Sequence, residues 1–158
     1  MVHKDLGNVN DLLKKMVQLE LVMAELYRTC GQILVSDKDF WTDLEKAEAH
    51  HAENIHLMSE IISEMPTSFE LGRPVKPAAI QTSIAGVQWN IQRLKKKELS
   101  EKNMLFIARD LEQSTLESNY GEIVKTNDIE YKNLINQILS ETAVHRDRLN
   151  KKIQEIAP

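Results

Sequence analysis

In AEAHHAENIHLM, residues 47–58, apolar and ionisable residues recur every three or four positions. Residues at that spacing share one face of an α-helix. The shared face contains Glu48, His51, Ile55 and Met58, so a carboxylate and an imidazole stand inside an apolar stripe. The stretch therefore predicts a helix that buries two ionisable side chains.

Three other segments repeat the pattern of a carboxylate within an apolar stripe. One carries Glu20, a second carries Glu112, and the last carries both Glu141 and His145. Burying one uncompensated carboxylate costs several kcal/mol, about the net stability of a whole domain. Two divalent cations would neutralise four such groups, and neutral imidazoles would complete the coordination. A hydrogen-bonded or protonated polar layer in the core is the alternative interpretation.

Length and composition favour one helical domain spanning residues 1–158. Hydrophobic residues make up 42% of the chain and charged residues 28%, while aromatic residues at 5% and only 5 glycines favour helix. The formal charge of −4 gives no general attraction to nucleic acid. We interpret the basic run Lys95–Lys97 as a solvated helix end.

Cysteine usage and the first residues of the chain bear on its compartment. Cys30 is the single cysteine, which excludes an intramolecular disulfide and a CxxC electron-transfer site. The first residues, MVHKDLGNVND, have no apolar core, so we expect neither a signal peptide nor a membrane span. The expected location is the cytoplasm.

Helical periodicity and turn signals divide the chain into five expected helices, at about 10–31, 37–64, 78–97, 101–126 and 128–156. Ser36, Ser100 and Asn127 are the expected N-caps of three of them. Short turns join the first two helices and the last two, which predicts two antiparallel hairpins. Prolines mark the long connection between the hairpins, and the helix at 78–97 follows them. The expected fold is an all-α antiparallel four-helix bundle with an additional helix in the crossover.

On these residues the chain resembles the ferritin-like superfamily, and most of all its rubrerythrin-related branch. That family places a Glu on each of two helices and a Glu-x-x-His pair on each of the other two, around two metals. Glu20, followed by Tyr27 seven residues on, matches the first helix. Glu48 and His51 match the second helix, and Glu112 in LEQSTLE matches the third.

The last helix departs from the family pattern by one position. Thr142 stands where a Glu would precede His145 by three residues, and the nearest carboxylate is Glu141, four residues before the histidine. Residues four apart still share a helical face, so Glu141 remains an expected ligand. The sequence also lacks the cysteine-ligated rubredoxin module of rubrerythrins.

The resemblance implies two iron ions per chain, or iron with manganese, that react with dioxygen or hydrogen peroxide. The implied metal ligands are Glu20, Glu48, His51, Glu112, Glu141 and His145. An external electron donor and a homodimer are compatible with it, and no nucleic acid or membrane partner is expected. One alternative is a bundle without redox metal chemistry that works as a structural or protein-interaction module. Iron storage in a large assembly is a third hypothesis.

Some residues of similar type are expected to lie outside the site. A second Glu-x-x-His pair, Glu53 and His56, has polar neighbours on its helical face and is predicted to be on the surface. Glu117 is five residues after Glu112, about 140° around the helix, so it is also predicted to be a surface charge. Tyr27 and Tyr120 are interpreted as packing residues, with hydrogen bonding or radical chemistry as the alternative.

Overall fold

The computed structural model of the protein describes residues 2–73 and 75–156. It is 85% helical, which places the protein in the all-α class, as predicted. The helices are α1 (Val2–Ile33), α2 (Lys38–Glu64), α3 (Pro77–Lys95), α4 (Glu101–Glu117) and α5 (Ile129–Ile156), and the strands are β1 (Phe69–Leu71) and β2 (Val124–Thr126). Single 3₁₀ turns occupy Val35–Asp37, Pro66–Ser68 and Tyr120–Glu122.

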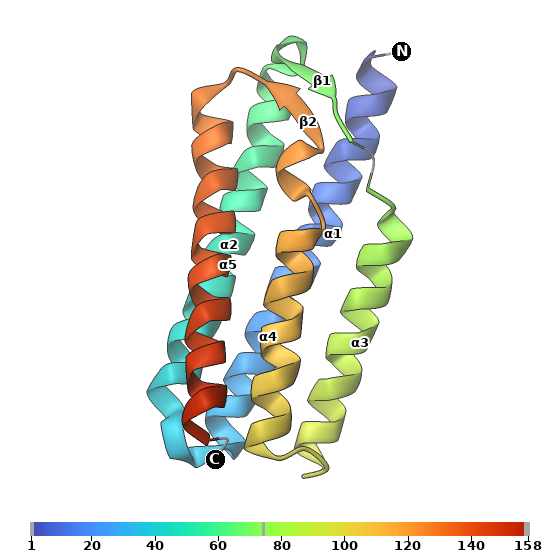
Figure 1. Cartoon of the computed structure of the whole chain (residues 1–158). Coiled ribbons are helices and arrows are strands. Elements are labelled where there is room, and N and C mark those ends of the chain that lie inside the picture. Colours follow the sequence, from blue (N-terminus) through green and yellow to red (C-terminus); the bar gives the residue numbers. More distant parts are fainter. Residues whose placement is uncertain (1, 74, 157–158) are drawn as a thin grey trace.

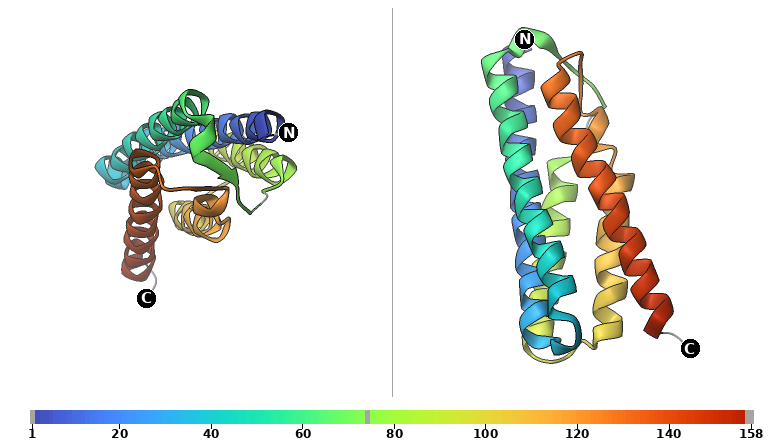
Figure 2. Two further views of the ribbon diagram at one scale, coloured as in Figure 1. Left: turned by 90° about the horizontal axis from the view of Figure 1, so that it is seen from above. Right: turned by 90° about the vertical axis from the view of Figure 1, so that its left-hand side faces the viewer.

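The helices lie side by side along one long axis (Figure 1). α1 and α2 form one antiparallel pair, α4 and α5 form another, and α2 also packs against α5 (Figure 2). The crossover helix α3 packs along α1, runs in the same direction as α1, and lies on the opposite side of the molecule from α5. Both predicted hairpins and the additional helix are therefore present.

Several helix ends differ from the sequence prediction. α1 begins at Val2 rather than near residue 10, because buried Leu6 and Val9 extend its apolar stripe toward the N-terminus. α3 ends at Lys95 and α4 at Glu117, earlier than predicted. Lys97 and Asn119 follow these two helices with φ of 59° and 57°. This left-handed conformation is a common way to end a helix.

Aspartates cap two of the helices where other residues were predicted. Ser100 caps α4 as predicted, since its Oγ accepts a hydrogen bond from the amide three residues on. The predicted caps Ser36 and Asn127 were each wrong by one residue. The side chains of Asp37 and Asp128 instead accept the amide hydrogen bonds at the starts of α2 and α5. A carboxylate at a helix N-terminus also interacts favourably with the helix dipole, which gives aspartate an advantage there.

A two-stranded antiparallel sheet, which the sequence pattern does not indicate, joins the two hairpins at one end of the molecule (Figure 1). β1 lies in the crossover and β2 in the α4–α5 connection, with Phe69 opposite Thr126. Phe69 is buried and packs edge-on against Tyr131, at 5.2 Å between ring centroids. A Cβ added to Gly72 would stand 2.0 Å from the carbonyl oxygen of Glu122, so only glycine fits this close approach.

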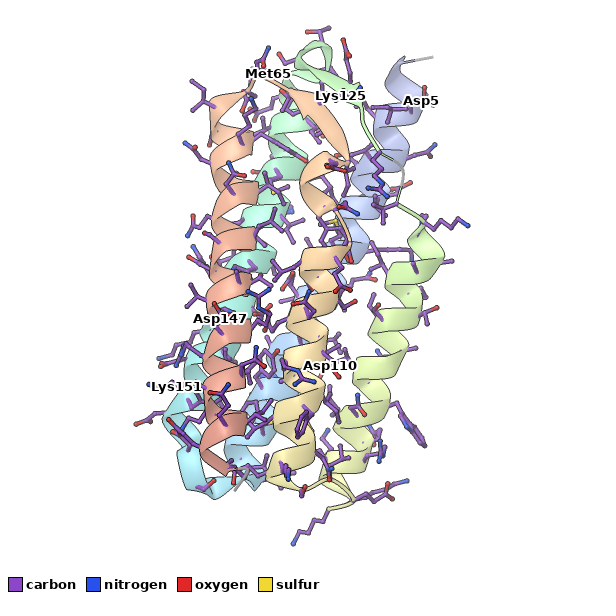
Figure 3. The ribbon with its side chains drawn as sticks, in the orientation of Figure 1. Asp5, Met65, Asp110, Lys125, Asp147 and Lys151 are labelled. Carbon is purple, nitrogen blue, oxygen red and sulfur yellow. The ribbon has the colours of Figure 1, made fainter. Side chains whose placement is uncertain are left out.

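Apolar side chains from all of the helices fill the space between them (Figure 3). Trp41 is 1% exposed and packs on Tyr27, with 5.9 Å between ring centroids. Trp89 on α3 is instead 62% exposed. None of the helices in the described residues has the length and the apolar character needed to cross a membrane.

Candidate metal centre

Five ionisable side chains that the sequence predicts as ligands meet between the helices. Each is at most 6% exposed, although charged residues are rarely buried unless they have partners. They come from four helices: Glu20 from α1, Glu48 and His51 from α2, Glu112 from α4, and His145 from α5. Each occupies the apolar face of its helix, so the packing that buries the aliphatic residues also brings these groups together.

The first group consists of Glu20, Glu48 and His51. The Nδ1 atom of His51 lies 3.8 Å from Oε2 of Glu20 and 3.6 Å from Oε2 of Glu48. Bonds from a metal to carboxylate oxygen or imidazole nitrogen are about 2.0–2.2 Å long, so two ligands of one ion lie roughly 3–4 Å apart. The three side chains are therefore spaced as ligands of one cation would be.

The second group consists of Glu48, Glu112 and His145. The Nδ1 atom of His145 lies 3.3 Å from Oε1 of Glu48 and 3.8 Å from Oε1 of Glu112. Glu48 belongs to both groups, with one carboxylate oxygen facing each histidine. The rings of His51 and His145 are nearly parallel, with 5.8 Å between their centroids. Two cations bound here would share the Glu48 carboxylate.

Several atoms of these groups are buried without a hydrogen-bond partner. They are Oε2 of Glu20, Oε1 of Glu48, and Nδ1 of both His51 and His145. A buried polar atom without a partner costs about 1–3 kcal/mol, and more if it is charged, so native proteins rarely leave one unpaired. Here the unpaired atoms point toward one another, and they are the atom types that bind iron, manganese or zinc. The side chains therefore fit a pair of transition-metal ions.

Burial changes the proton affinity of these groups. It raises the pKa of Glu20 and of Glu112 well above that of an ordinary carboxyl, and the charge of Glu48 adds to the rise. Burial alone would lower the pKa of His51, but Glu20 and Glu48 outweigh it and raise that pKa to about 11. Burial and the charge of His51 lower the pKa of His145 to about 4. Protons thus balance the charge of the group, and a bound cation would displace them.

Tyr27 has a second role besides the predicted packing. It is fully buried, and its hydroxyl donates a hydrogen bond of 2.7 Å to Oε1 of Glu112. The sequence signal was its position seven residues after Glu20, which places both side chains on one face of α1. Tyr27 therefore holds the carboxylate of another helix in place.

The structure does not bring Glu141, the sixth predicted ligand, into either group. Its side chain is 38% exposed, and its Oε2 atom lies 2.7 Å from Nε2 of His51, the ring nitrogen that faces away from the other carboxylates. Gln137 donates a hydrogen bond of 3.0 Å to its other oxygen. Burial alone would raise the pKa of Glu141, but these two partners lower it.

Thr142 occupies the inward position that Glu141 lacks. It lies three residues before His145 on α5 and is 1% exposed. Its hydroxyl donates a hydrogen bond of 2.7 Å to the carbonyl oxygen of Ile138, one turn earlier. Successive helical residues are about 100° apart, so the shift by one position turns the carboxylate of Glu141 away from the interior and toward α2.

The charged residues predicted to lie on the surface do lie there. Glu53, His56 and Glu117 are all exposed. His56 pairs with Glu60 of its own helix at 3.3 Å. The chain thus contains two Glu-x-x-His pairs on the same helix, one buried and one solvated, and the apolar neighbours of the first are what distinguish them.

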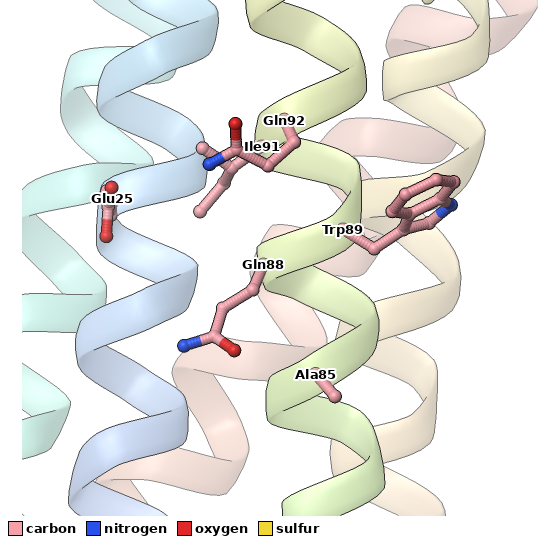
Figure 4. Close-up of a pocket in the computed structure, with 6 residues that line it drawn as sticks. All are labelled: Glu25, Ala85, Gln88, Trp89, Ile91 and Gln92. Carbon is pink, nitrogen blue, oxygen red and sulfur yellow. The ribbon is translucent and has the colours of Figure 1, made fainter.

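A surface pocket on the outer side of the molecule is unrelated to these groups (Figure 4). It has a volume of about 470 Å³ and lies between α1 and α3, where Glu25, Gln88, Trp89 and Gln92 are among the residues that line it. No candidate metal ligand lines this pocket. The donor atoms converge in the interior between the helices and not in an open cleft.

Comparison with family models, with curated proteins and with solved structures gives no match for this chain.

Proposed function

We propose that the protein is a ferritin-like antiparallel four-helix bundle that binds two iron ions, or one iron and one manganese, between its helices. One observation carries this proposal: carboxylate and imidazole side chains from four helices converge in two buried groups that share Glu48, and four of their atoms have no hydrogen-bond partner. The resemblance of the sequence to the rubrerythrin-related branch agrees with the same residues.

Each side chain has a distinct part in the proposed centre. Glu48 would be a ligand to both ions, since one of its oxygens faces His51 and the other faces His145. Glu20 and His51 complete the protein ligands of one ion, and Glu112 and His145 those of the other. Three protein ligands per ion leave coordination positions open, which is typical of reactive rather than purely structural metal sites.

The proposed activity is reaction with dioxygen or hydrogen peroxide. A pair of ferrous ions held by these residues would supply the two electrons that, together with two protons, reduce hydrogen peroxide to two molecules of water. An external electron donor would then restore the ferrous state. The chain contributes a dry interior that keeps bulk water from the ions, and a hydrogen bond from Tyr27 that fixes the carboxylate of Glu112.

Metal titration tests the proposal. Protein stripped with chelator should take up two ferrous ions per chain under anaerobic conditions at neutral pH, as measured by elemental analysis after gel filtration. Uptake should weaken on acidification, because protons compete for the carboxyls and imidazoles. The loaded protein should then oxidise its iron when hydrogen peroxide is added. Absence of stoichiometric uptake of iron or manganese would refute the proposal.

The chain provides its own matched control for this experiment. Glu48→Ala removes the shared ligand and should abolish binding at both positions. Glu53→Ala removes the glutamate of the exposed Glu-x-x-His pair on the same helix and should leave uptake unchanged. Circular dichroism and thermal unfolding of both variants separate loss of ligands from loss of fold.

A structural or protein-interaction module is the second candidate function. The raised pKa values of Glu20 and Glu112, together with the Tyr27 hydrogen bond, are compatible with a protonated polar layer that needs no metal. In that case Glu112→Leu should stabilise the protein whether or not metal is added. Iron storage would require a large assembly, and light scattering would identify one directly.

A further inference from the structure

Glu141 contacts the proposed centre through a histidine and not through a metal. Its Oε2 atom lies 2.7 Å from Nε2 of His51, while Nδ1 of the same ring faces Glu20 and Glu48. When Nε2 carries the ring proton and donates a hydrogen bond to Glu141, Nδ1 has a free lone pair that can bind a metal. A carboxylate in this position fixes the imidazole tautomer and ring orientation, and it makes the other nitrogen a stronger ligand.

The carboxylate of Glu141 is itself held in place. Its Oε1 atom accepts a hydrogen bond of 3.0 Å from Gln137, one turn earlier on α5, so each of its oxygens has a protein partner. Its side chain remains 38% exposed, whereas that of His51 is fully buried. Glu141 therefore stays hydrated enough to keep its charge while it supports a buried ligand.

His145 has no equivalent support. No hydrogen bond joins its Nε2 atom to any residue that the structure describes, and its Nδ1 atom faces Glu48 and Glu112. Oε1 of Glu112, the oxygen that faces His145, also accepts the hydrogen bond from Tyr27. That hydrogen bond withdraws electron density from the oxygen and weakens it as a ligand.

The charges are distributed in the same unequal way. Glu20, Glu48 and Glu112 bring three negative charges, one fewer than the four positive charges of two divalent ions. Thr142 adds none, and its hydroxyl is bound to Ile138. Glu141 supplies the fourth negative charge, but on the side of His51 only.

We infer that the two metal positions differ in affinity, that the position at His51 fills first, and that Glu141 is the positioning residue that establishes this order. The inference rests on the proposed dinuclear function. It adds an order of loading, which would allow the protein to hold two different metals in defined places.

Calorimetric titration of chelator-stripped protein with Mn²⁺ under anaerobic conditions tests the order of loading. Two binding events should appear, with the first at least about tenfold tighter than the second, because losing a support of this kind typically costs 10- to 100-fold in affinity. A crystal grown with one equivalent of Mn²⁺ should show anomalous density at the His51 position alone. Equal density at both positions, or density at His145 alone, would overturn the inference.

Variants of Glu141 test its role. Glu141→Ala should weaken the first event by about 10- to 100-fold and leave the second nearly unchanged. Glu141→Gln keeps an acceptor oxygen without the charge and should restore part of the loss. Glu155→Ala removes an exposed carboxylate of the same helix and should change neither event.

The outcomes separate the inference from the function on which it rests. Two equal events in the natural protein overturn the order of loading, and a first event that Glu141→Ala does not weaken overturns the role of Glu141. Either result leaves the dinuclear centre standing. No binding event at all overturns both. Because the side chain of Glu141 is partly exposed, its variants should fold, and thermal unfolding of each variant checks this.

Discussion

At the scale of single residues, the feature that dominates the molecule is the set of carboxyl groups buried between helices. Glu20, Glu48 and Glu112 are each at most 3% exposed, and no lysine or arginine pairs with them in the described residues. The metal-free protein must therefore hold protons there or bear the cost of buried charge. Loss of one carboxyl should therefore change the stability of the protein in opposite directions in the metal-free and the metal-bound states.

Glu20→Gln tests that opposition. In metal-free protein at pH 7 the variant should be more stable than the natural protein by about 1–3 kcal/mol, since a neutral amide of equal size replaces a group that is costly to ionise. The raised pKa of Glu20 makes this difference largest above that pKa and smaller as the pH falls through it. In the presence of metal the sign should reverse. Urea unfolding with and without Mn²⁺ at two pH values measures each effect.

The exposed Glu53 provides the control for this prediction. Glu53→Gln should change the free energy of unfolding by no more than about 0.5 kcal/mol in either state. A Glu20→Gln variant that is less stable than the natural protein without metal would mean that the carboxyl already has a favourable partner there.

How far the sequence predicts the candidate site also depends on single residues. Helical periodicity identifies five side chains that meet in the interior. The apolar stripe of each helix shows by itself which residues of that helix face inward. It does not distinguish Glu141 from Thr142, because residues three and four before His145 both lie near the same face. The contact between Glu141 and His51 depends on how α5 packs on α2, and the residue pattern of a single helix does not reveal that packing.

At the scale of secondary-structure elements, Asp37 links the start of α2 to the end of α5. Its carboxylate caps α2 and pairs with Lys152. The hydrogen bond from Lys152 is the main reason that the pKa of Asp37 is lowered, and the capping amide adds to it. A lowered pKa stabilises the folded state at neutral pH, and that contribution is lost as the pH falls through the folded-state value.

Two substitutions of Asp37 separate the cap from the charge. Asp37→Ala should destabilise the protein at pH 7 by about 1 kcal/mol, since the cap is lost. Asp37→Asn retains a capping oxygen and should cost less. The difference between the Asn variant and the natural protein should shrink as the pH falls below about 4, where the ordinary carboxyl protonates, and disappear below the lowered folded-state pKa of Asp37. Thermal unfolding at pH 7 and pH 3 measures both differences.

Asp39→Asn, in the same turn of α2, is the matched control, because its exposed side chain has no hydrogen bond or ion pair with any residue the structure describes. A difference between Asp37→Asn and the natural protein that persists unchanged at pH 3 would contradict a role for the charge.

The elements themselves were predictable to different degrees. Long apolar stripes identify all of the helices, since each has enough turns for the periodicity to be clear. β1 and β2 are three residues each, too short for an alternating pattern, and each is paired by a partner more than fifty residues away. The end of α4 depends on the left-handed backbone conformation of Asn119, which the residues around it do not indicate.

At the scale of the whole molecule, the two hairpins are connected by the packing of α2 on α5 and by the β1–β2 pair at one end. At Gly72 the crossover chain lies directly against the α4–α5 connection. Its amide donates a hydrogen bond of 2.9 Å to the carbonyl oxygen of Ile123. The same close approach leaves no room for a side chain.

Gly72→Ala should therefore loosen the connection between the hairpins. The added methyl would stand 2.0 Å from the carbonyl oxygen of Glu122, a backbone atom that cannot move aside without shifting the strand. We expect a loss of about 1–3 kcal/mol in the free energy of unfolding, as for other overpacked positions. Amide hydrogen exchange should show the loss of protection concentrated in β1 and β2.

Gly86→Ala is the control of opposite sign. Gly86 lies on the exposed side of α3 with nothing within 4 Å of an added Cβ, so alanine should stabilise the protein by about 0.5–1 kcal/mol. Equal effects of the two substitutions would contradict the steric role of Gly72.

The two tryptophans give the molecule an internal optical reporter. Trp41 is 1% exposed and packs against Tyr27, whose hydroxyl donates a hydrogen bond to a proposed metal ligand, whereas Trp89 is 62% exposed on the outer helix. Iodide in solution should quench the emission of Trp89 and spare that of Trp41. The remaining blue-shifted fluorescence then comes from the interior, where an arriving paramagnetic ion would dim it without any label being attached.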